Sequence, residues 1–481
     1  MIKVKWNKEI YEVKASNAVE LKQELEKKTG VPVARQKLMA RGAWVGILKD
    51  TTSLAKLKAD QQVTLMGTAE VLVEKEQPKF VEDMAEEEVA KSGAVLPAGL
   101  QNLGNTCYMN STVQCLRAVP ELRQSLEEYN GAGSSLTGAL HHTYNRLDAS
   151  TKPIMPSDLI LTLRATFPQF AEKSRNGQGF AQQDAEELLA TLFAELSMRL
   201  TQNNNNTVDT LFGIDLQENL SCAETQDEPP VIRQDKARKL VCNIQGGHGA
   251  STKIDHLHEG IKIGLSGTLE KRSDILGRNA IWNKTQTIVK LPPYLCIQFM
   301  RFFWKPTPNN DDHQGVKCKI MRPVSFPETF DVFDYCQQDL QKELKFNRDA
   351  YGAKLDQLPT SEKDQDGDTE MSGQDDTELA KAIALSMTND TNAVLPPDFT
   401  QHGLPAQFLG EYEIFAVVTH KGRSADGGHY MGWVRQDKDK WLVFDDDIVT
   451  ESSTEFVVNN LKGGGDEHMA YLAFYRAKAG R

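Results

Sequence analysis

One cysteine of the chain stands where its thiol could act as a nucleophile. Cys107 follows residues 99–106, which are rich in glycine and amide side chains, and it begins an apolar-periodic run that predicts a helix. A helix N-terminus offers partial positive charge and unpaired N–H groups, and both favour a thiolate over a thiol. Asn102, five residues before the cysteine, could donate a hydrogen bond to a substrate carbonyl oxygen as negative charge develops on it.

A histidine and an aspartate near the other end of the chain could complete this chemistry. His429 lies within residues 427–434, a predicted strand that begins with two glycines, and Asp445, Asp446 and Asp447 follow it. A thiol nucleophile needs a base, and the base needs a group that orients it. Cysteine, histidine and aspartate in this order, far apart in sequence, are typical of a thiol hydrolase whose triad assembles only in the folded chain.

Length and composition indicate a folded protein of more than one domain. The 481 residues can bury a sizeable core, and 40% apolar residues with 25% charged residues are typical of a globular chain. The formal net charge of −12 argues against nucleic-acid and anionic-membrane partners. The first residues lack the apolar core of a signal peptide, and no apolar run reaches the length of a membrane span.

Cysteine usage predicts a cytoplasmic and nuclear protein. The chain has seven cysteines, an odd number, and none of them stands in a C-x-x-C pair. Such a set in a chain of this length is typical of reduced thiols. Apart from Cys107, the cysteines are expected to be core or surface thiols, because free cysteine packs like a small apolar residue.

Hydrophobic periodicity separates an N-terminal unit from the rest of the chain. Within residues 1–75, two stretches of alternating apolar residues come first, then a helix is predicted over 18–28, and two short strands follow. Residues 76–97 are rich in glutamate, show little periodicity and are predicted to form an acidic linker.

The remaining residues, 98–479, predict one α+β domain. Helical spacing over residues 107–126 and 157–200 comes before a series of strand patterns. Residues 351–400 interrupt this domain, and they are too polar and acidic to pack, so we expect a disordered insert there.

Four ordered segments resemble the signature blocks of the ubiquitin-specific protease family. They are residues 99–111 around Cys107, 182–187 (QQDAEE), 291–302 (LPPYL running into QFMRF) and 412–445 around His429. The resemblance implies a papain-like protease domain with thumb, palm and fingers, acting as a cysteine-type ubiquitinyl hydrolase. Many members bind structural zinc through two C-x-x-C pairs in their fingers. Cys222 and Cys242 stand in that region without paired partners, so we predict no metal and no cofactor.

The resemblance also implies a role for each candidate residue. Cys107 would attack the carbonyl carbon of the C-terminal glycine of ubiquitin, and His429 would accept and later return the proton. Asn102 and the backbone N–H of Cys107 would stabilise the oxyanion. The spacing in the family favours Asp445 as the residue that orients His429, with Asp446 as the alternative, a helper of the water or the oxyanion.

Three further polar residues near these blocks are expected to support the site without reacting. Gln183 and Asp184 are predicted to order the cleft from the thumb. His420 lies nine residues before His429 and is expected to pack behind the site.

Two segments outside the protease blocks predict binding partners. The order of elements in residues 1–75 resembles the β-grasp of ubiquitin, and residues 36–42 are similar to the turn around its hydrophobic patch. This built-in ubiquitin-like domain is expected to dock on the 26S proteasome regulatory particle. Residues 375–387 resemble a ubiquitin-interacting motif, and a short helix that folds back on its own domain is the alternative. Ubiquitin and polyubiquitinated proteins are the expected substrates.

Two loops next to the third and fourth signature blocks are expected to overhang the cleft and control access to it. Residues 305–316 and 419–428 are polar and carry glycine or proline. In the proteasome-associated branch of the family, such loops block the tail of ubiquitin until the enzyme docks. The leading hypothesis is a proteasome-associated deubiquitinase that trims bound substrates. A non-catalytic ubiquitin adaptor and a protease for another ubiquitin-like modifier are the alternatives.

Overall fold

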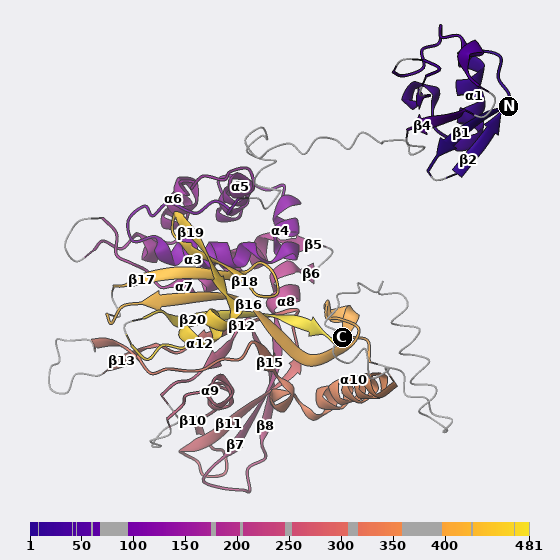
Figure 1. Cartoon of the computed structure of the whole chain (residues 1–481). Helices are drawn as coiled ribbons and strands as arrows, with labels where there is room; N and C mark the ends of the chain where they lie inside the picture. The colour runs from indigo at the N-terminus through magenta and orange to yellow at the C-terminus, as the bar shows by residue number, and fades with distance from the viewer. Residues whose placement is uncertain are drawn as a thin grey trace. The chain divides into compact units, whose positions relative to one another are not determined.

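The computed structural model shows two compact units, Met1–Asp83 and Met84–Arg481 (Figure 1). The described residues are 1–7, 9–40, 42–44, 46–58, 61–67, 95–174, 179–202, 205–245, 253–305, 316–357, 397–424, 427–465 and 467–480. The predicted motif at 375–387 lies outside them, as do most of the predicted linker at 76–97 and residues 306–315 of the first predicted loop.

The N-terminal unit is a β-grasp, a four-stranded sheet packed on one helix. Its elements are β1 (Ile2–Trp6), β2 (Glu9–Val13), α1 (Ala18–Thr29), β3 (Lys37–Met39) and β4 (Gln62–Met66). The strand order is β2-β1-β4-β3, with β1 and β4 parallel and the other pairs antiparallel. Alternation along the strands directs Val4, Val63 and Leu65 toward Leu21 and Leu25 of α1, and all five are buried. The predicted fold of this unit is confirmed.

Helices of the C-terminal unit come mostly before its strands. They are α3 (Cys107–Arg117), α4 (Pro120–Glu127), α5 (Leu136–Asp148), α6 (Ser157–Thr166), α7 (Ala185–Arg199), α8 (Thr207–Phe212), α9 (Leu257–Gly264), α10 (Gln338–Gln357) and α12 (Thr454–Asn460). The predicted helical stretch 107–126 is two helices, because Pro120 begins α4 and cannot continue α3. None of the helices among the described residues is long and apolar enough to cross a membrane.

The strands of the C-terminal unit form one large sheet, one smaller sheet and two short hairpins. They are β5 (Thr201–Gln202), β6 (Asn205–Asn206), β7 (Ile214–Cys222), β8 (Val231–Ala237), β9 (Leu240–Cys242), β10 (Ser266–Arg272), β11 (Asn279–Lys290), β12 (Tyr294–Phe299), β13 (Phe302–Lys305), β14 (Val316–Lys319), β15 (Thr329–Asp331), β16 (Phe408–Lys421), β17 (His429–Arg435), β18 (Lys440–Asp445), β19 (Ile448–Ser453) and β20 (Met469–Ala479). The large sheet has the order β19-β18-β17-β16-β20-β12-β9, with β15 beside β16, and the smaller one β10-β11-β7-β8. The predicted α+β class is confirmed.

The large sheet carries a hydrophobic core on each face. Along β16, Phe415 and Val418 pack into the core that includes α3, whereas Ile414 and Val417 belong to the core on the opposite face. All residues of α3 from Cys107 to Leu116 are buried. A helix enclosed on all sides is held in one position by close packing. The first residue of α3 is therefore fixed relative to the sheet.

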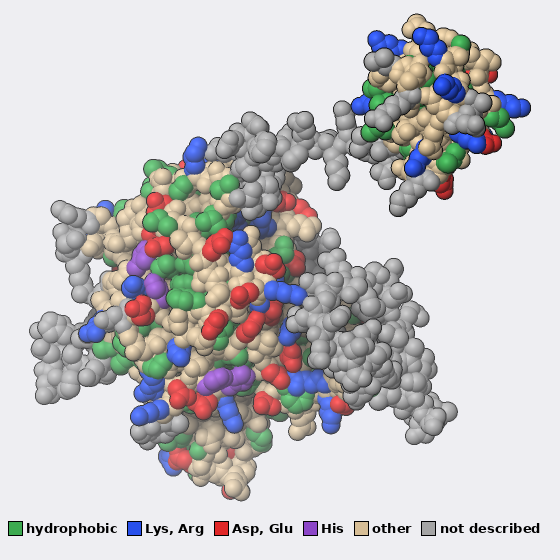
Figure 2. Space-filling model, in the orientation of Figure 1, with side chains coloured by type: hydrophobic (Ala, Val, Ile, Leu, Met, Phe, Trp, Pro, Cys, Tyr) green, Lys and Arg blue, Asp and Glu red, His purple; other side chains and the backbone are tan. Residues whose placement is uncertain are grey.

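Two cysteines considered for a metal site lie in different sheets. Cys222 ends β7 in the smaller sheet, and Cys242 is buried in β9 at the edge of the large sheet. Among the described residues, neither belongs to a group of three potential metal ligands. On the face shown in Figure 2, acidic and basic side chains are interspersed over this unit, unlike the single-sign surfaces that bind nucleic acid.

The predicted insert over residues 351–400 is wrong at both of its ends. Helix α10, which packs on the core through Leu340, Leu344 and Asn347, continues to Gln357 and so includes the first residues of the predicted insert. At the other end, Phe399 is buried in the same core as Leu344. The polar composition of the segment hid these contacts, since only one side of α10 is apolar.

We expect replacement of Leu344 by alanine to destabilise the C-terminal unit by about 3 kcal/mol, because it removes buried methyl groups and leaves a cavity. The control is Lys342→Ala, which removes an exposed side chain of the same helix paired with Asp339 and should change stability by less than about 0.5 kcal/mol. Calorimetric unfolding of the full chain measures both. Equal effects of the two substitutions would show that α10 is not part of the core.

Candidate active site

The loop before α3 places Cys107 at the start of the helix. Gly104 and Asn105 adopt positive φ angles of 92° and 55°, which turn the chain sharply. The side-chain oxygen of Asn102 accepts hydrogen bonds from the backbone N–H groups of Gly104 (3.0 Å) and Thr106 (3.2 Å). Cys107 is the first residue of α3 and is only 2% exposed. The predicted turn and helix start are both present.

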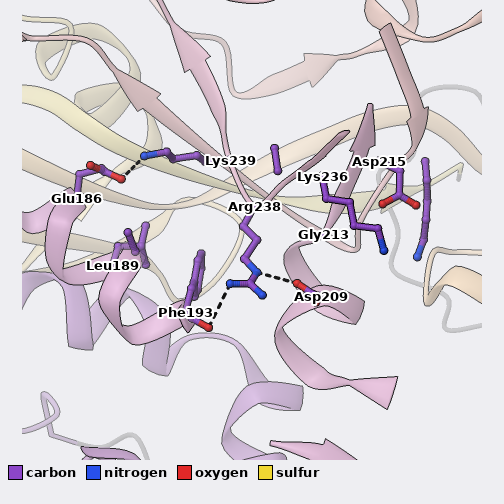
Figure 3. Close-up of a pocket in the computed structure, with 12 residues that line it drawn as sticks. Glu186, Leu189, Phe193, Asp209, Gly213, Asp215, Lys236, Arg238 and Lys239 are labelled. Carbon is purple, nitrogen blue, oxygen red and sulfur yellow. Dashed lines mark hydrogen bonds and ion pairs between the residues drawn. The ribbon is translucent and has the colours of Figure 1, made fainter. Parts of the chain in front are cut away.

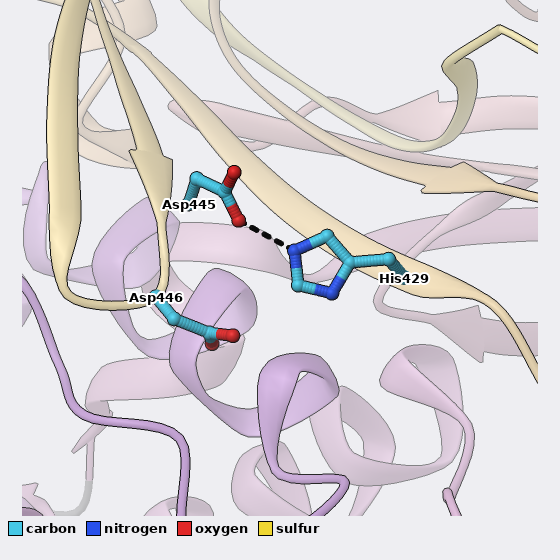
Figure 4. Close-up of side chains that lie close together, drawn as sticks. All are labelled: His429, Asp445 and Asp446. Atoms are coloured by element: carbon cyan, nitrogen blue, oxygen red, sulfur yellow. Dashed lines mark hydrogen bonds and ion pairs between the residues drawn. The ribbon is translucent and has the colours of Figure 1, made fainter.

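His429 and Asp445 meet on neighbouring strands. His429 begins β17 and Asp445 ends β18, and the imidazole Nε2 lies 2.5 Å from the carboxylate Oδ1 of Asp445 (Figure 4). The side chain of Cys107 also interacts with this imidazole. The bond to Cys107 raises the pKa of His429 to about 9; partial burial opposes this change, and the bond to Asp445 adds to it. The structure thus brings the three predicted residues into one chain of contacts.

Asp446 has a different set of partners from Asp445. Its φ of 54° turns it out of the strand, and its two carboxylate oxygens accept hydrogen bonds from the side-chain amides of Asn102 and Asn110, each 2.8 Å long. The backbone carbonyl of Asp446 accepts from the N–H of Leu100 at 2.8 Å. A Cβ on Gly99 would lie only 2.5 Å from that carbonyl, so glycine allows this close approach. Asp446 therefore joins the β18 turn to the segment that carries Asn102.

Sequence reasoning missed two of the residues that build this site. Asn110 lies one turn after Cys107 on α3, and Gln182 precedes α7. The Nε2 of Gln182 donates to the Sγ of Cys107 at 3.1 Å and to the carbonyl of Gly428 at 3.0 Å. The sequence analysis predicted Gln183, the second of two adjacent glutamines, as a supporting residue. In the structure, the first of them, Gln182, contacts the thiol.

The predicted supporting residues lie around the site. Asp184 caps α7 by accepting from the N–H of Glu186 at 2.9 Å, and it also accepts from the Tyr471 hydroxyl at 2.6 Å. His420 is 1% exposed, and its ring lies edge-on to Tyr430, with 4.5 Å between ring centroids. Both residues fix neighbouring elements.

The other buried cysteines occupy environments that retain the thiol proton. Burial raises the pKa of Cys115, Cys242 and Cys336 to about 12 in each case. All cysteines of the chain are free thiols. Three thiols locked in the protonated form are inert as nucleophiles.

Among the described residues, His429, Asp445 and Asp446 form a group whose potential metal-ligating atoms lie within 4.8 Å of one another. These atoms already have hydrogen-bond partners. His429 and Asp445 bind each other, and both oxygens of Asp446 accept amide donors. A fully paired set of this kind fits an imidazole-orienting network better than a metal site.

A separate cavity of about 380 Å³ lies between α7 and the smaller sheet (Figure 3). Two ion pairs cross it, Lys239 with Glu186 and Arg238 with Asp209, the latter at 2.7 Å. Cys107 and His429 do not line it. In Figure 3 these two ion pairs join α7 and α8 to the segment that follows β8, so the cavity is a structural junction.

Comparison with known proteins identifies the family of the chain. The family described as ubiquitin carboxyl-terminal hydrolase matches residues 98–475. Ubiquitin carboxyl-terminal hydrolase 6 of Arabidopsis thaliana is 39% identical, over 99% of this chain and 98% of its own.

Two further relatives match over nearly the full chain. Ubiquitin carboxyl-terminal hydrolase 6 of Schizosaccharomyces pombe is 33% identical over 99% of this chain and 98% of its own. Ubiquitin carboxyl-terminal hydrolase 14 of Caenorhabditis elegans is 30% identical over 99% and 93%. The match covers both the β-grasp unit and the unit that holds Cys107 and His429. The chain therefore belongs to the ubiquitin carboxyl-terminal hydrolase family, and it is a cysteine deubiquitinase.

Proposed function

We propose that the protein hydrolyses isopeptide bonds at the C-terminal glycine of ubiquitin, with Cys107 as nucleophile, and that it trims ubiquitin from proteasome-bound substrates. The observation that supports the catalytic part is the position of His429, which interacts with Cys107 and hydrogen-bonds Asp445. A chain of thiol, imidazole and carboxylate is the arrangement that generates a nucleophile and returns its proton.

The catalytic cycle follows from these contacts. The Cys107 thiolate attacks the glycine carbonyl carbon, and a C–S bond forms while the carbonyl oxygen takes up negative charge. Imidazolium at His429 then donates its proton to the lysine nitrogen as the C–N bond breaks. Water attacks the resulting thioester, His429 accepts a proton from it, and the C–S bond breaks to release ubiquitin and the thiolate.

Asn102 is suited to stabilise the oxyanion because its orientation is fixed. Its oxygen accepts two backbone N–H groups, so its NH₂ group must face the opposite way, where one of its hydrogens binds Asp446. In this proposal the second hydrogen donates to the oxyanion. A preoriented donor of this kind contributes about 3 kcal/mol to transition-state stabilisation. Asp446 then acts on the oxyanion through Asn102, in agreement with the alternative role considered from the sequence.

The exposed face of the β-grasp sheet supports a docking role. On the side opposite α1, Ile10, Met39 and Met66 are exposed by 57%, 40% and 51%. Met39 pairs with Thr64, Lys37 with Met66, and Lys5 with Ile10 across the strands. Apolar side chains interspersed with lysines would fit a partner surface that is apolar and acidic. We assign this face to the regulatory particle of the 26S proteasome.

Control by docking completes the proposal. The second predicted loop, 419–428, leads directly into His429, and its residue Gly428 is bonded to Gln182 beside the thiol. A shift of this loop would move groups at the nucleophile. We propose low activity for the free chain and a higher rate on the proteasome, in the cytoplasm and nucleus.

A ubiquitin probe with a thiol-reactive C-terminus should label Cys107. We expect Cys107→Ala to abolish labelling, since it removes the nucleophile, and Cys222→Ala to leave it unchanged, because Cys222 lies on β7 in the smaller sheet. Mass spectrometry of the labelled chain identifies the modified residue. Labelling of the Cys107→Ala variant, or an unlabelled wild-type chain even with proteasome present, would contradict the proposed nucleophile.

The pH dependence of kcat/KM should show an alkaline limb near pH 9. The raised pKa of His429 means that imidazolium is present below this pH and is lost as pH rises through it, which removes the general acid. Asp445→Asn weakens a bond that favours imidazolium, so the limb should move to lower pH. Asp447→Asn, at an exposed neighbour, is the control and should leave it in place. If the alkaline limb of Asp445→Asn stays at the same pH, the Asp445 carboxylate does not contribute to the pKa of His429.

Substituting the exposed face of the N-terminal unit should uncouple the enzyme from the proteasome. We expect M39E/M66E to lose co-purification with the regulatory particle and stimulation by it, because two charges replace apolar contact area, while basal cleavage of a fluorogenic ubiquitin amide persists. Val19→Glu, at an exposed position of α1, is the control and should bind normally. Retained binding of M39E/M66E would place the docking surface elsewhere.

A further inference from the structure

A partly buried lysine reaches from one hairpin to the turn that leads into His429. Lys319 ends β14, and its ammonium group donates to three acceptors on the end of β16 and the following turn. They are the ring Nδ1 of His420, the backbone carbonyl of His420 at 3.3 Å and the backbone carbonyl of Gly422 at 2.6 Å. All three N–H groups of the lysine are therefore directed at one short segment.

The surroundings of Lys319 disfavour its charge. Burial lowers its pKa to about 8, and nearby Arg301 adds to the decrease. Its acceptors are neutral, and it forms no ion pair with a carboxylate among the described residues. A methionine of similar length would fill the same space without losing hydration of a cation. The stability of the fold therefore does not explain why this residue is a lysine. The direction of its N–H groups toward the turn before His429 does.

The other end of the turn that Lys319 binds is hydrogen-bonded to Gln182, which lies next to Cys107. Gly422 and Gly428 have φ angles of 102° and 138°, a backbone conformation that residues with a Cβ atom rarely adopt. A Cβ on Gly428 would lie 2.4 Å from the Lys421 carbonyl and 2.8 Å from Nε2 of His420. The carbonyl of Gly428 accepts from Gln182, which also contacts Cys107.

We propose that Lys319 is a positioning residue for His429. It fixes the first residue of the turn and the ring of His420, Gln182 fixes the last residue, and His429 follows immediately in β17. Because Gly428 packs directly against His420, a displaced His420 ring would move the residue that precedes the imidazole. This inference rests on the proposed role of His429 as the partner of Cys107.

Three variants test the proposal. Lys319→Met keeps the length of the side chain and removes its donors, and Lys319→Arg keeps donors at the same place. Lys440→Met is the matched control, because it removes a half-exposed lysine of β18 that pairs with Glu451 at 2.6 Å. Steady-state cleavage of a fluorogenic ubiquitin amide gives kcat and KM. Iodoacetamide alkylation of Cys107 near pH 6, followed by mass spectrometry, reports the thiol–imidazole pair without ubiquitin, and circular dichroism gives the folded fraction.

For Lys319→Met we expect kcat to fall by about tenfold or more with KM changed by less than about threefold, since small misplacements of a catalytic group lower the chemical step. Alkylation of Cys107 should slow by about fivefold, because the imidazolium that maintains the thiolate is displaced. Lys319→Arg should recover most of both rates, and Lys440→Met should match the wild type.

Four outcomes would overturn the assignment of Lys319. The first is a Lys319→Met variant with wild-type rates, and the second is a fall in its rates no larger than its fall in folded fraction. The third is a folded Lys319→Arg variant whose rates are as low as those of Lys319→Met. The fourth is an equal fall in the rates of Lys440→Met. Failure of the wild-type chain to cleave the ubiquitin amide even with proteasome present would instead contradict the proposed function. The alkylation rates still test Lys319 in that case, because they do not depend on ubiquitin.

Discussion

The turn after β18 holds the two halves of the site in register. Asp445 and Asp446 are adjacent, yet the first binds His429 on the sheet and the second binds Asn102 and Asn110 on the helical side. The positive φ of Asp446 rotates its side chain away from the partner of Asp445. Two neighbouring carboxylates repel each other, and separate donors for each offset that repulsion. A shift of this turn would therefore move the general base and the oxyanion donor together.

The sequence indicates the residues that we propose to react, whereas it indicates few of those that position them. Cys107 has a local signature, a glycine and amide turn before a helix, and His429 follows two glycines. Asn110 and Gln182 lie inside recognisable segments but nothing local marks them as contacts of the site, and Lys319 lies outside those segments. Their partners lie 336, 75 and 101 residues away in the chain. Such contacts depend on how elements pack, which periodicity does not encode.

The hydrophobic periodicity of the sequence was enough to predict the fold class of each unit. Alternation and helical spacing report which side of an element is buried, so the β-grasp and the α+β arrangement followed from residues 1–75 and 98–479. Boundaries depend on single buried contacts instead. Helix α10 continues to Gln357, past the predicted start of the insert, and Phe399 brings the other end of the insert into the core, although the composition around them is strongly polar.

Two buried cysteines of α3 differ in the groups that their sulfur atoms contact. Cys107 and Cys115 are 2% and 0% exposed on the same helix. The sulfur of Cys115 faces the backbone carbonyls of Val417 and Trp433 at 3.6 and 3.9 Å, and burial raises its pKa to about 12. The sulfur of Cys107 faces the N–H of Gln182 and the imidazole of His429. A thiol nucleophile needs a neighbouring base, so the imidazole beside Cys107 is the difference that supports the proposed role of this cysteine over Cys115.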